Sequence, residues 1–588
     1  MNIGKIVSII SNLVKVKIDF PVGQNEICHI KHNGLELMSE VIRVSDGFAF
    51  IQVFESTQGL KIDDEVIFRN NMLEVTLGPG LLSRNYDGLQ NDLDKLTGTF
   101  LRRGEVSLPL AEDIPYHFKP LVKKGDIVSG GDWLGSVKEN WIDHKIMVPF
   151  KYNENGTIKW IAKKGEYFIN DKIAKIQFED SGLMDITMTQ KWPVKVPIRS
   201  YRDKPRPSDI LQTGVRSIDT FNPITEGGTG FIPGPFGAGK TVLQHALAKN
   251  AKADLIIMTA CGERANEVVE IFTEFPELID ANTGRKLQER TTIICNTSNM
   301  PVAAREASIY VGMTIAEYYR NMGLKVLLLA DSTSRWAQAL REMSNRMEEL
   351  PGPDAYPIDL SAVIANYYAR AGRVELRNRK FGSVTFIGTV SPAGGNLKEP
   401  VTESTRKVAR CFYALDQKRA DAKRYPAIEP LESYSKYLEY PEFISFANMH
   451  IEAGWVEMVG HAKDIVKKGE EAKNQINILG DDAVPIEYHI LFWKREVIDF
   501  IILQQDAFDE IDENCPIDRQ KYMLKKVLWV CDQVSDFNGF EEVINFYRKV
   551  IDLLKQMNYS PFESIEFKRY EEQLNEMFAQ NMIVNDQI

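Results

Sequence analysis

The chain has 588 residues, of which 44% are hydrophobic and 26% charged, a composition typical of a soluble globular protein with roughly three or four domains. Its net charge of −11 argues against broad binding to nucleic acid or to anionic membranes, because both require a basic surface. The cysteines are scattered without a Cys-x-x-Cys pair, no signal peptide is recognisable, and no apolar run reaches the roughly 18 residues of a membrane span. We therefore expect a cytoplasmic protein whose connection to any membrane depends on partners.

Residues 1–77 are expected to form a small N-terminal β-barrel. Short strand-like runs alternate there with sharp turns, and Asn33-Gly34 and Asp46-Gly47 are strong hairpin signals. The expected strands are Val14–Ile18, Glu26–Lys31, Leu35–Val44 and Phe48–Phe54.

Residues 103–191 are expected to form a second β-rich unit, inserted into the domain that follows. This region is punctuated by glycine, and Lys123-Lys124-Gly125-Asp126 is echoed by Lys163-Lys164-Gly165-Glu166. The proline-rich segment after it, as far as Pro207, should run extended and mark a boundary.

An α/β nucleotide domain is expected over residues 78–102 and 192–436, and an α-helical domain over residues 437–588. Apolar strands alternate with helices in the first of these regions, which indicates a parallel sheet covered on both faces. Helical periodicity dominates the second, as in Tyr488–Phe508 and Val543–Met557. The expected strands of the sheet are Thr229–Pro233, Ala253–Thr259, Thr291–Asn296, Lys325–Ala330 and Val384–Val390, with a helix over Val302–Met322.

A phosphate loop lies between the first of these strands and a helix. Residues 234–241 read Gly-Pro-Phe-Gly-Ala-Gly-Lys-Thr, which fits glycine, four residues, glycine, lysine, then serine or threonine. Backbone N–H groups of such a loop cradle phosphates, the lysine adds a positive charge, and the hydroxyl can bind Mg²⁺. The predicted nucleotide-binding residues here are Gly234, Pro235, Phe236, Gly237, Ala238, Gly239, Lys240, Thr241 and Val242.

Carboxylates follow two of the expected strands, at the edge of the sheet where active groups gather. Asp331 comes directly after an apolar strand and suits Mg²⁺ opposite Thr241, with a helix N-cap as its alternative role. Glu263 could accept a hydrogen bond from the attacking water, and Arg264 could reach a γ-phosphate. A plain surface pair of Glu263 with Arg264 remains the alternative.

Six segments in this order resemble the catalytic A subunit of V-type and archaeal A-type rotary ATPases. They are the phosphate loop, Cys-Gly-Glu-Arg-Ala-Asn-Glu (261–267), Asp-Ser-Thr-Ser-Arg-Trp (331–336), Pro-Gly-Pro-Asp-Ala-Tyr-Pro (351–357), Ala-Gly-Arg-Val (371–374) and Ser-Pro-Ala-Gly-Gly (391–395). The resemblance covers most of the chain, including the barrel, the insertion and the helical end.

The resemblance implies ATP and ADP as ligands, with Mg²⁺. Lys240 and Thr241 would hold phosphate and metal, Glu263 would polarise water and Arg264 would contact the γ-phosphate. Glu267 and Asp331 would orient the waters of the metal, and Phe412 and Phe508 would lie against adenine.

The resemblance also implies partners and a place in the cell. A and B subunits would alternate in an A3B3 ring, with central and peripheral stalk subunits, and the chain would be cytoplasmic and peripheral to a membrane sector that conducts H⁺ or Na⁺. Two alternatives are a RecA-type hexameric motor acting on nucleic acid or protein, and a non-catalytic nucleotide-binding scaffold. The acidic balance and the β-rich insertion argue against the motor, and the presence of Lys240 and Glu263 argues against the scaffold.

Overall fold

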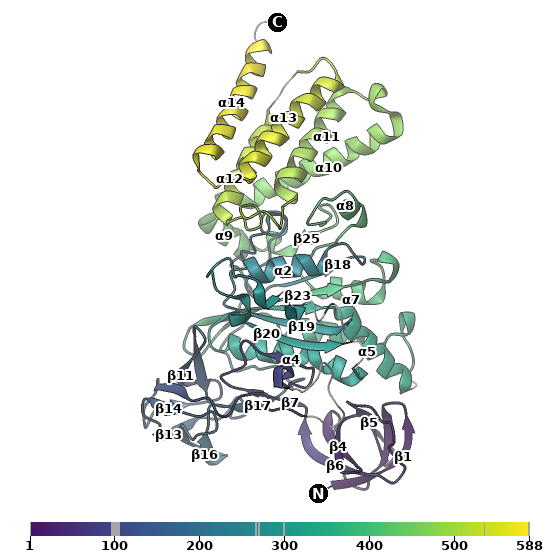
Figure 1. Cartoon of the computed structure of the whole chain (residues 1–588), viewed down its shortest axis with the longest axis vertical. Coiled ribbons are helices and arrows are strands. Elements are labelled where there is room, and N and C mark those ends of the chain that lie inside the picture. Colours follow the sequence, from purple (N-terminus) through teal and green to yellow (C-terminus); the bar gives the residue numbers. More distant parts are fainter. Residues whose placement is uncertain are drawn as a thin grey trace.

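The computed structural model describes residues 2–95, 106–264, 267, 271–273, 275–297, 300–347, 349–533 and 536–585. The molecule is elongated (Figure 1). A barrel and a separate β-rich unit lie side by side at one end, a mixed sheet with its helices lies in the middle, and a helical bundle forms the other end. Among the described helices, none combines the length and the apolar composition that a membrane crossing requires.

The N-terminal barrel is closed by its first and sixth strands, in the order β1-β2-β5-β4-β3-β6. Its hairpin turns form where the sequence predicts them: Asn33 and Gly34 have φ of 48° and 80°, and Asp46 and Gly47 have φ of 52° and 80°, the left-handed backbone that such turns need. The barrel strands are β1 (Asn2–Ile10), β2 (Leu13–Lys17), β3 (Glu26–His32), β4 (Leu35–Ser45), β5 (Phe48–Val53) and β6 (Glu65–Met72).

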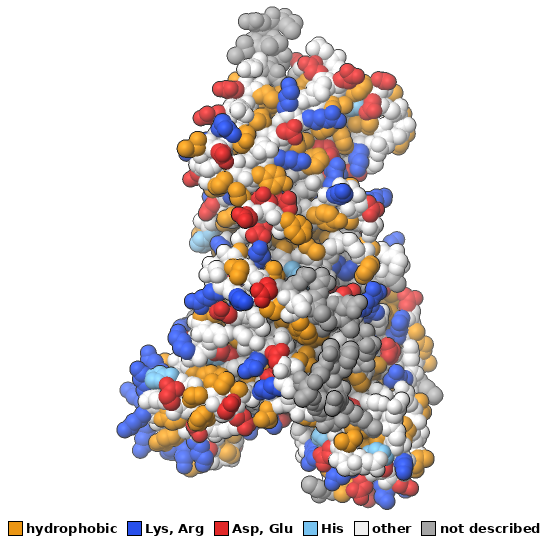
Figure 2. Space-filling view, in the orientation of Figure 1, with side chains coloured by type: hydrophobic (Ala, Val, Ile, Leu, Met, Phe, Trp, Pro, Cys, Tyr) orange, Lys and Arg blue, Asp and Glu red, His pale blue; other side chains and the backbone are white. Residues whose placement is uncertain are grey.

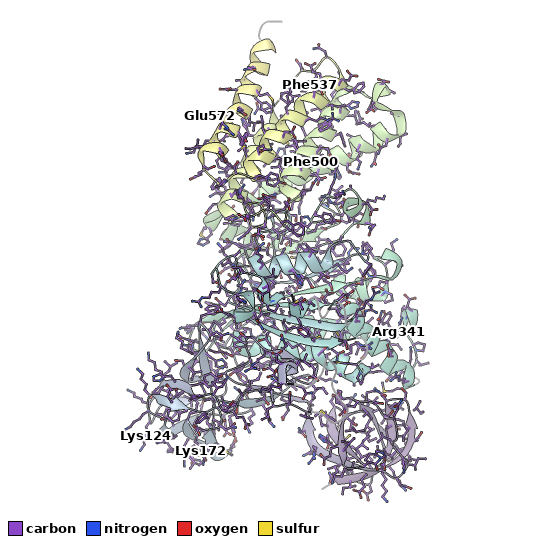
Figure 3. All side chains as sticks on the ribbon, viewed as in Figure 1. Lys124, Lys172, Arg341, Phe500, Phe537 and Glu572 are labelled. Carbon is purple, nitrogen blue, oxygen red and sulfur yellow. The ribbon has the colours of Figure 1, made fainter. Side chains whose placement is uncertain are left out.

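The inserted unit consists of two four-stranded sheets, ordered β10-β13-β15-β16 and β12-β11-β9-β14. Each of the two repeated segments is followed by a turn closed in the same way. The Ser129 N–H donates to Asp132 Oδ2 and the Phe168 N–H donates to Asp171 Oδ2, each at 2.8 Å. Lysines gather on the outer face of this unit (Figure 2), and Lys124 and Lys172 mark its free end (Figure 3). Its strands are β9 (Tyr116–Pro120), β10 (Ile127–Val128), β11 (Trp133–Glu139), β12 (Ile142–Met147), β13 (Gly156–Ile161), β14 (Gly165–Tyr167), β15 (Ala174–Phe178) and β16 (Gly182–Ile186).

A buried polar cluster fixes the inserted unit to the central domain. Glu139 accepts hydrogen bonds from the Gly80 and Leu82 N–H groups at 2.7 and 3.0 Å, and His144 bridges Glu139 and the Tyr318 hydroxyl at 2.6 and 2.8 Å. Because these groups are buried and bonded, their geometry sets the orientation of the unit. The connecting strands β7 (Glu74–Leu77) and β17 (Gln190–Pro193) pair with each other.

The central sheet has nine strands, ordered β25-β24-β18-β23-β21-β19-β20-β8 with β22 beside β23. Helix α2 covers one face, and α4 and α5 cover the other (Figure 1). Its strands are β8 (Asn85–Tyr86), β18 (Thr229–Pro233), β19 (Leu255–Glu263), β20 (Thr291–Thr297), β21 (Lys325–Asp331), β22 (Gly372–Glu375), β23 (Phe381–Val390), β24 (Cys411–Phe412) and β25 (Tyr434–Ser435). Its helices are α1 (Arg216–Asp219), α2 (Lys240–Asn250), α4 (Val302–Arg320), α5 (Thr333–Arg346), α6 (Leu360–Tyr368), α7 (Pro400–Val408) and α8 (Gln417–Asp421).

The helical end shares one apolar core with the face of the sheet that α2 covers. The expectation of a continuous helix over Tyr488–Phe508 is wrong at its C-terminal end. Helix α11 stops at Ile498, a π-helical turn spans Asp499–Leu503, and the Gln505 N–H bonds to the carbonyl of Tyr425 at 2.8 Å instead of continuing the helix. The helices are α9 (Pro441–His450), α10 (Trp455–Leu479), α11 (Ile486–Ile498), α12 (Ile517–Asp532), α13 (Phe540–Asn558) and α14 (Ile565–Asn585).

Candidate active site

The phosphate loop connects β18 to α2, as the sequence predicts. Gly237 and Gly239 have φ of 81° and 88°, which a residue with a side chain rarely adopts. A Cβ atom at Gly234 would lie 2.7 Å from the Cβ of Leu415, so this glycine is required by close approach. The Lys240 Nζ donates to the carbonyls of Gly234 and Pro235, both at 2.8 Å. The loop is thus shaped for phosphate while its lysine bonds to the loop itself.

Asp331 reaches the loop from the end of β21. Its Oδ1 accepts a hydrogen bond from the Thr389 hydroxyl at 2.6 Å, and its Oδ2 lies 3.4 Å from the Thr241 hydroxyl. The N-cap position of α5 belongs to Ser332, so the alternative role of Asp331 as that N-cap does not apply. Thr241 and Asp331 therefore bring oxygen ligands together beside the loop, the donor chemistry that Mg²⁺ prefers.

Glu263 ends β19 on the same edge of the sheet and is 9% exposed. Burial, a hydrogen bond with Glu267 and the charge of Asp331 raise the pKa of Glu263 to about 9. Burial also lowers the pKa of Lys240, against the opposing effect of these carboxylates. Several acidic groups therefore share a partly dry site with Lys240, and a divalent cation would relieve their repulsion.

Arg264 follows Glu263 and turns toward the loop. Its guanidinium lies over the ring of Phe236, 5.2 Å from the ring centroid, and Phe236 is 77% exposed. This contact keeps a cation at the outer side of the loop, at a tip open to approach from outside the chain.

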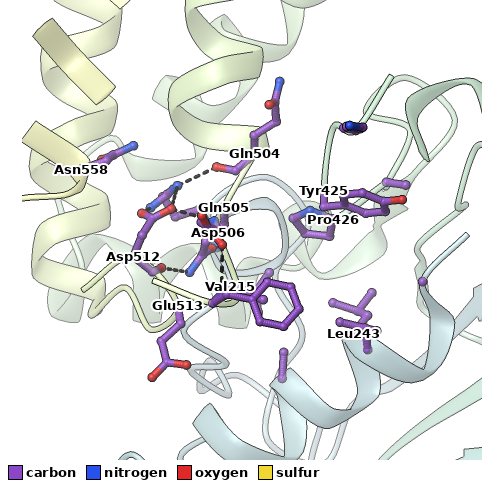
Figure 4. A pocket seen from close by; sticks show the side chains of 18 of the residues that line it. Val215, Leu243, Tyr425, Pro426, Gln504, Gln505, Asp506, Asp512, Glu513 and Asn558 are labelled. Carbon is purple, nitrogen blue, oxygen red and sulfur yellow. Dashed lines mark hydrogen bonds and ion pairs between the residues drawn. The ribbon is translucent and has the colours of Figure 1, made fainter. Parts of the chain in front are cut away.

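A cavity of about 510 Å³ opens beside Gly237, Ala238 and Gly239. Phe508 and Val242 both line it and are 91% and 53% exposed, so they lie on its open side. Tyr425 and Pro426 face residues Gln504–Asp512 across this cavity (Figure 4). Its size, aromatic lining and closeness to the loop suit a nucleotide base.

Phe412 does not reach this cavity. Its ring is 1% exposed and stacks on Tyr434 at 5.5 Å, within the core beside β18. The expectation that Phe412 lies against adenine is therefore wrong in this structure, and Tyr425 occupies the corresponding wall. The sequence did not lead us to expect Tyr425 as a residue of the base site. Its position before a proline, at the end of a charged run, is typical of a surface turn and could have suggested that its ring is accessible.

A buried ion pair holds the opposite wall of the cavity (Figure 4). Arg216 pairs with Asp512, and its Nη2 donates to the carbonyl of Gln504 at 2.6 Å. The Gln505 side chain accepts from the Arg216 N–H at 2.8 Å and donates to the carbonyls of Gly214 and Asp512 at 2.8 and 2.7 Å. This wall is therefore fixed before any ligand arrives.

Three family models match the chain in the order of its domains. They are the ATP synthase alpha/beta family beta-barrel domain over residues 6–70, the ATP synthase alpha/beta subunit barrel-sandwich domain over 107–195, and the ATP synthase alpha/beta family nucleotide-binding domain over 214–435. These matches support the N-terminal β-barrel, the β-rich unit and the nucleotide domain of the predicted fold class, and the helices α9–α14 of the structure supply the predicted helical end.

Similar proteins match over nearly the whole chain. The V-type ATP synthase alpha chain of Borrelia hermsii is 47% identical over 577 residues, which is 98% of this chain and 97% of that protein. The V-type ATP synthase alpha chain of Treponema denticola is 45% identical over 580 residues, covering 98% and 96% of the two chains. Neither the hexameric motor nor the scaffold alternative is favoured by these matches. The chain therefore belongs to the ATP synthase alpha/beta family and, within it, to the V-type ATP synthase alpha chains.

Proposed function

We propose that the chain binds Mg-ATP at the phosphate loop and hydrolyses or forms it, as the catalytic subunit of a rotary ion-translocating ATPase. One observation carries the proposal: Lys240, Glu263 and Asp331 meet at a loop that is shaped for phosphate and lies beside a base-sized cavity. A scaffold that only holds nucleotide needs no buried carboxylate at this position.

The chain's own residues account for the steps of phosphoryl transfer. Lys240 exchanges its bonds to the Gly234 and Pro235 carbonyls for bonds to phosphate oxygens, which keeps the ammonium satisfied throughout. A bound cation would lower the raised pKa of Glu263, and the carboxylate would then orient the attacking water and accept its proton, while Arg264 offers positive charge to the γ-phosphate. Thr241 and Asp331 would hold Mg²⁺ with Glu267 bonded to its waters, and the metal would neutralise charge that develops on the phosphates.

The partners follow from family membership. We infer that the chain alternates with B subunits in an A3B3 ring, that stalk subunits connect this ring to a membrane sector passing H⁺ or Na⁺, and that the chain is cytoplasmic and peripheral to the membrane. The exposed tip of the phosphate loop, where Phe236 and Arg264 meet, suits a site completed by a neighbouring chain.

Glu263→Gln tests this function. The change keeps the shape of the side chain but removes the proton acceptor, so kcat of the assembled complex should fall by about 10²–10⁴ while Mg-ATP still binds. Glu226→Gln is the matched control, because Glu226 is also a carboxyl whose pKa is raised by burial but it bonds to Lys325 outside the site. Normal turnover by Glu263→Gln would refute the proposed role.

A further inference from the structure

A cluster of ion pairs lines a second cavity, of about 950 Å³, that shares Leu415 with the base cavity. The second cavity lies between the segment around α8 and the helices α10 and α11, and Arg419, Arg424 and Arg495 line it. These arginines meet Glu496 and Asp499, at the end of α11 and in the π-helical turn. The cluster therefore joins the nucleotide domain to the helical domain.

Arg424 is the member of this cluster that adjoins the base cavity, since its chain neighbours Lys423 and Tyr425 line that cavity. Its Nη2 lies 2.9 Å from Glu496 Oε2, its Nη1 pairs with Asp499, and the next residue in the chain is Tyr425. The Tyr425 carbonyl accepts the Gln505 N–H at 2.8 Å. A displacement of Arg424 would therefore move the aromatic wall that Tyr425 forms.

The same guanidinium supports a second wall residue. It lies over the ring of Phe500, 5.1 Å from the centroid, while Lys555 Nζ lies over that ring at 4.0 Å. Phe500 lines the base cavity, at the end of the helical domain nearest the sheet (Figure 3). Arg424 therefore contacts the ring of Phe500 and precedes Tyr425 in the chain, but it does not line the cavity itself.

The cluster is strong enough to impose this geometry. The Asp499 and Glu496 side chains are 1% and 6% exposed, and Arg424 is 25% exposed. Burial acts to raise the pKa of Asp499, but the charges of Arg419, Arg424 and Arg495 outweigh it and leave this pKa lowered. Arg424 bonds to Glu496 with both terminal nitrogens, a planar fork that fixes direction as well as distance.

We propose that Arg424 is a positioning residue for the nucleotide base: its fork on Glu496 and Asp499 holds Tyr425 and Phe500 in place, and thereby sets affinity for the base without contacting it. This inference rests on the proposed function, because it assigns the cavity to the base of the bound nucleotide. The new element is that Arg424, at the junction of two domains, affects binding of the base but not binding of the phosphates.

The test compares a ligand that has a base with one that has none. In the full-length chain, Arg424→Met should raise the dissociation constant for Mg-ATP by about 5- to 50-fold, which lies within the range of couplings between residues of one network. Binding of Mg-tripolyphosphate should stay within about twofold, because the phosphate loop is untouched. In the assembled complex KM should rise while kcat changes little, the sign of lost uniform binding.

Four further variants guard against a purely structural effect. Glu496→Gln should reproduce the shift, and the double variant should add little to either single change. Arg419→Met shares the Asp499 partner but does not adjoin the base cavity, so it should lower Tm and leave the affinity for Mg-ATP unchanged. Arg424→Lys keeps the charge but loses the fork, and should show a smaller shift than Arg424→Met.

The outcomes separate this inference from the proposed function. Equal weakening of Mg-ATP and Mg-tripolyphosphate, or an unchanged affinity for Mg-ATP in both Arg424 variants, would overturn the positioning role. A wild-type chain that binds neither ligand would refute the nucleotide function and the positioning role together.

Discussion

Lys240 bonds to the carbonyls of its own loop, and this arrangement bears on how the site accepts nucleotide. An ammonium in a partly buried site needs acceptors, and two loop carbonyls provide them at 2.8 Å. An incoming phosphate therefore replaces existing hydrogen bonds of Lys240 and does not pair a donor that was previously unpaired. The gain in free energy comes from the greater strength of bonds to charged oxygens.

Tyr425 and Phe508 are expected to contribute stacking and no phosphate chemistry. Tyr425→Ala and Phe508→Ala should each weaken Mg-ATP and Mg-GTP alike by about 1–3 kcal/mol, the range measured for base–aromatic stacking. Calorimetric titration of the full-length chain measures this. Phe412→Ala is the contrasting variant: its ring is in the core, so it should lower Tm and leave the affinity for nucleotide unchanged.

Among the residues of the candidate site, the sequence predicted those that a short motif or a neighbouring strand marks. Lys240 and Thr241 belong to a contiguous motif, and Asp331 follows an apolar strand, so neighbouring residues suffice to predict that they meet at the loop. Phe412 and Tyr425 have no such signature. Which of two aromatic residues faces a cavity depends on how the segment after β24 folds back, and that is decided by contacts with α11 and the turn after it, far along the chain.

At the end of α11, helical periodicity predicted a helix that the structure does not continue. Residues 499–508 keep helical spacing, yet Asp499 is drawn to Arg419 at 2.6 Å and the Gln505 N–H bonds to the Tyr425 carbonyl. Tertiary bonds thus override local preference. The barrel strands β2–β5 and the sheet strands β18, β19, β20, β21 and β23 were predicted because alternation and turn chemistry are local, while β1, β6 and β22 were not singled out. The end of helix α11 depends instead on another domain.

Asp499→Asn should destabilise this junction at neutral pH by about 3 kcal/mol or more, because it leaves buried guanidinium groups without their anion. The folded-state pKa of Asp499 lies below its unfolded value of about 4. Its stabilisation is therefore present above that pH and is lost as the pH falls through the folded pKa. Calorimetric Tm values should differ between wild type and variant at pH 7, and the difference should shrink on acidification; a constant difference would contradict the assignment.

For the whole molecule, the open side of the phosphate loop predicts that one chain alone is an incomplete enzyme. Phosphoryl transfer of this type gains about 10³–10⁵ in rate from an arginine placed on the γ-phosphate by a neighbouring chain or loop. We expect the isolated chain to bind Mg-ATP and turn it over slowly, and the B subunit proposed as its partner to raise kcat by at least about 10².

The measurement is steady-state ATPase activity of the monomeric chain against the reconstituted ring, with the monomeric state checked at assay concentration. Equal rates per chain would mean that one polypeptide holds a complete site.

The closed barrel at the N-terminus limits how chains can join. Strands β1 and β6 pair along Asn2–Lys5, so the sheet closes on itself and, within the described residues 2–72, leaves no edge strand. A neighbour cannot attach there by adding a strand, and it meets side chains only. Binding of a neighbour at this end of the molecule therefore depends on surface side chains, which can be substituted one at a time. Such substitutions leave the closed barrel intact, and a closed barrel resists fibrous self-association.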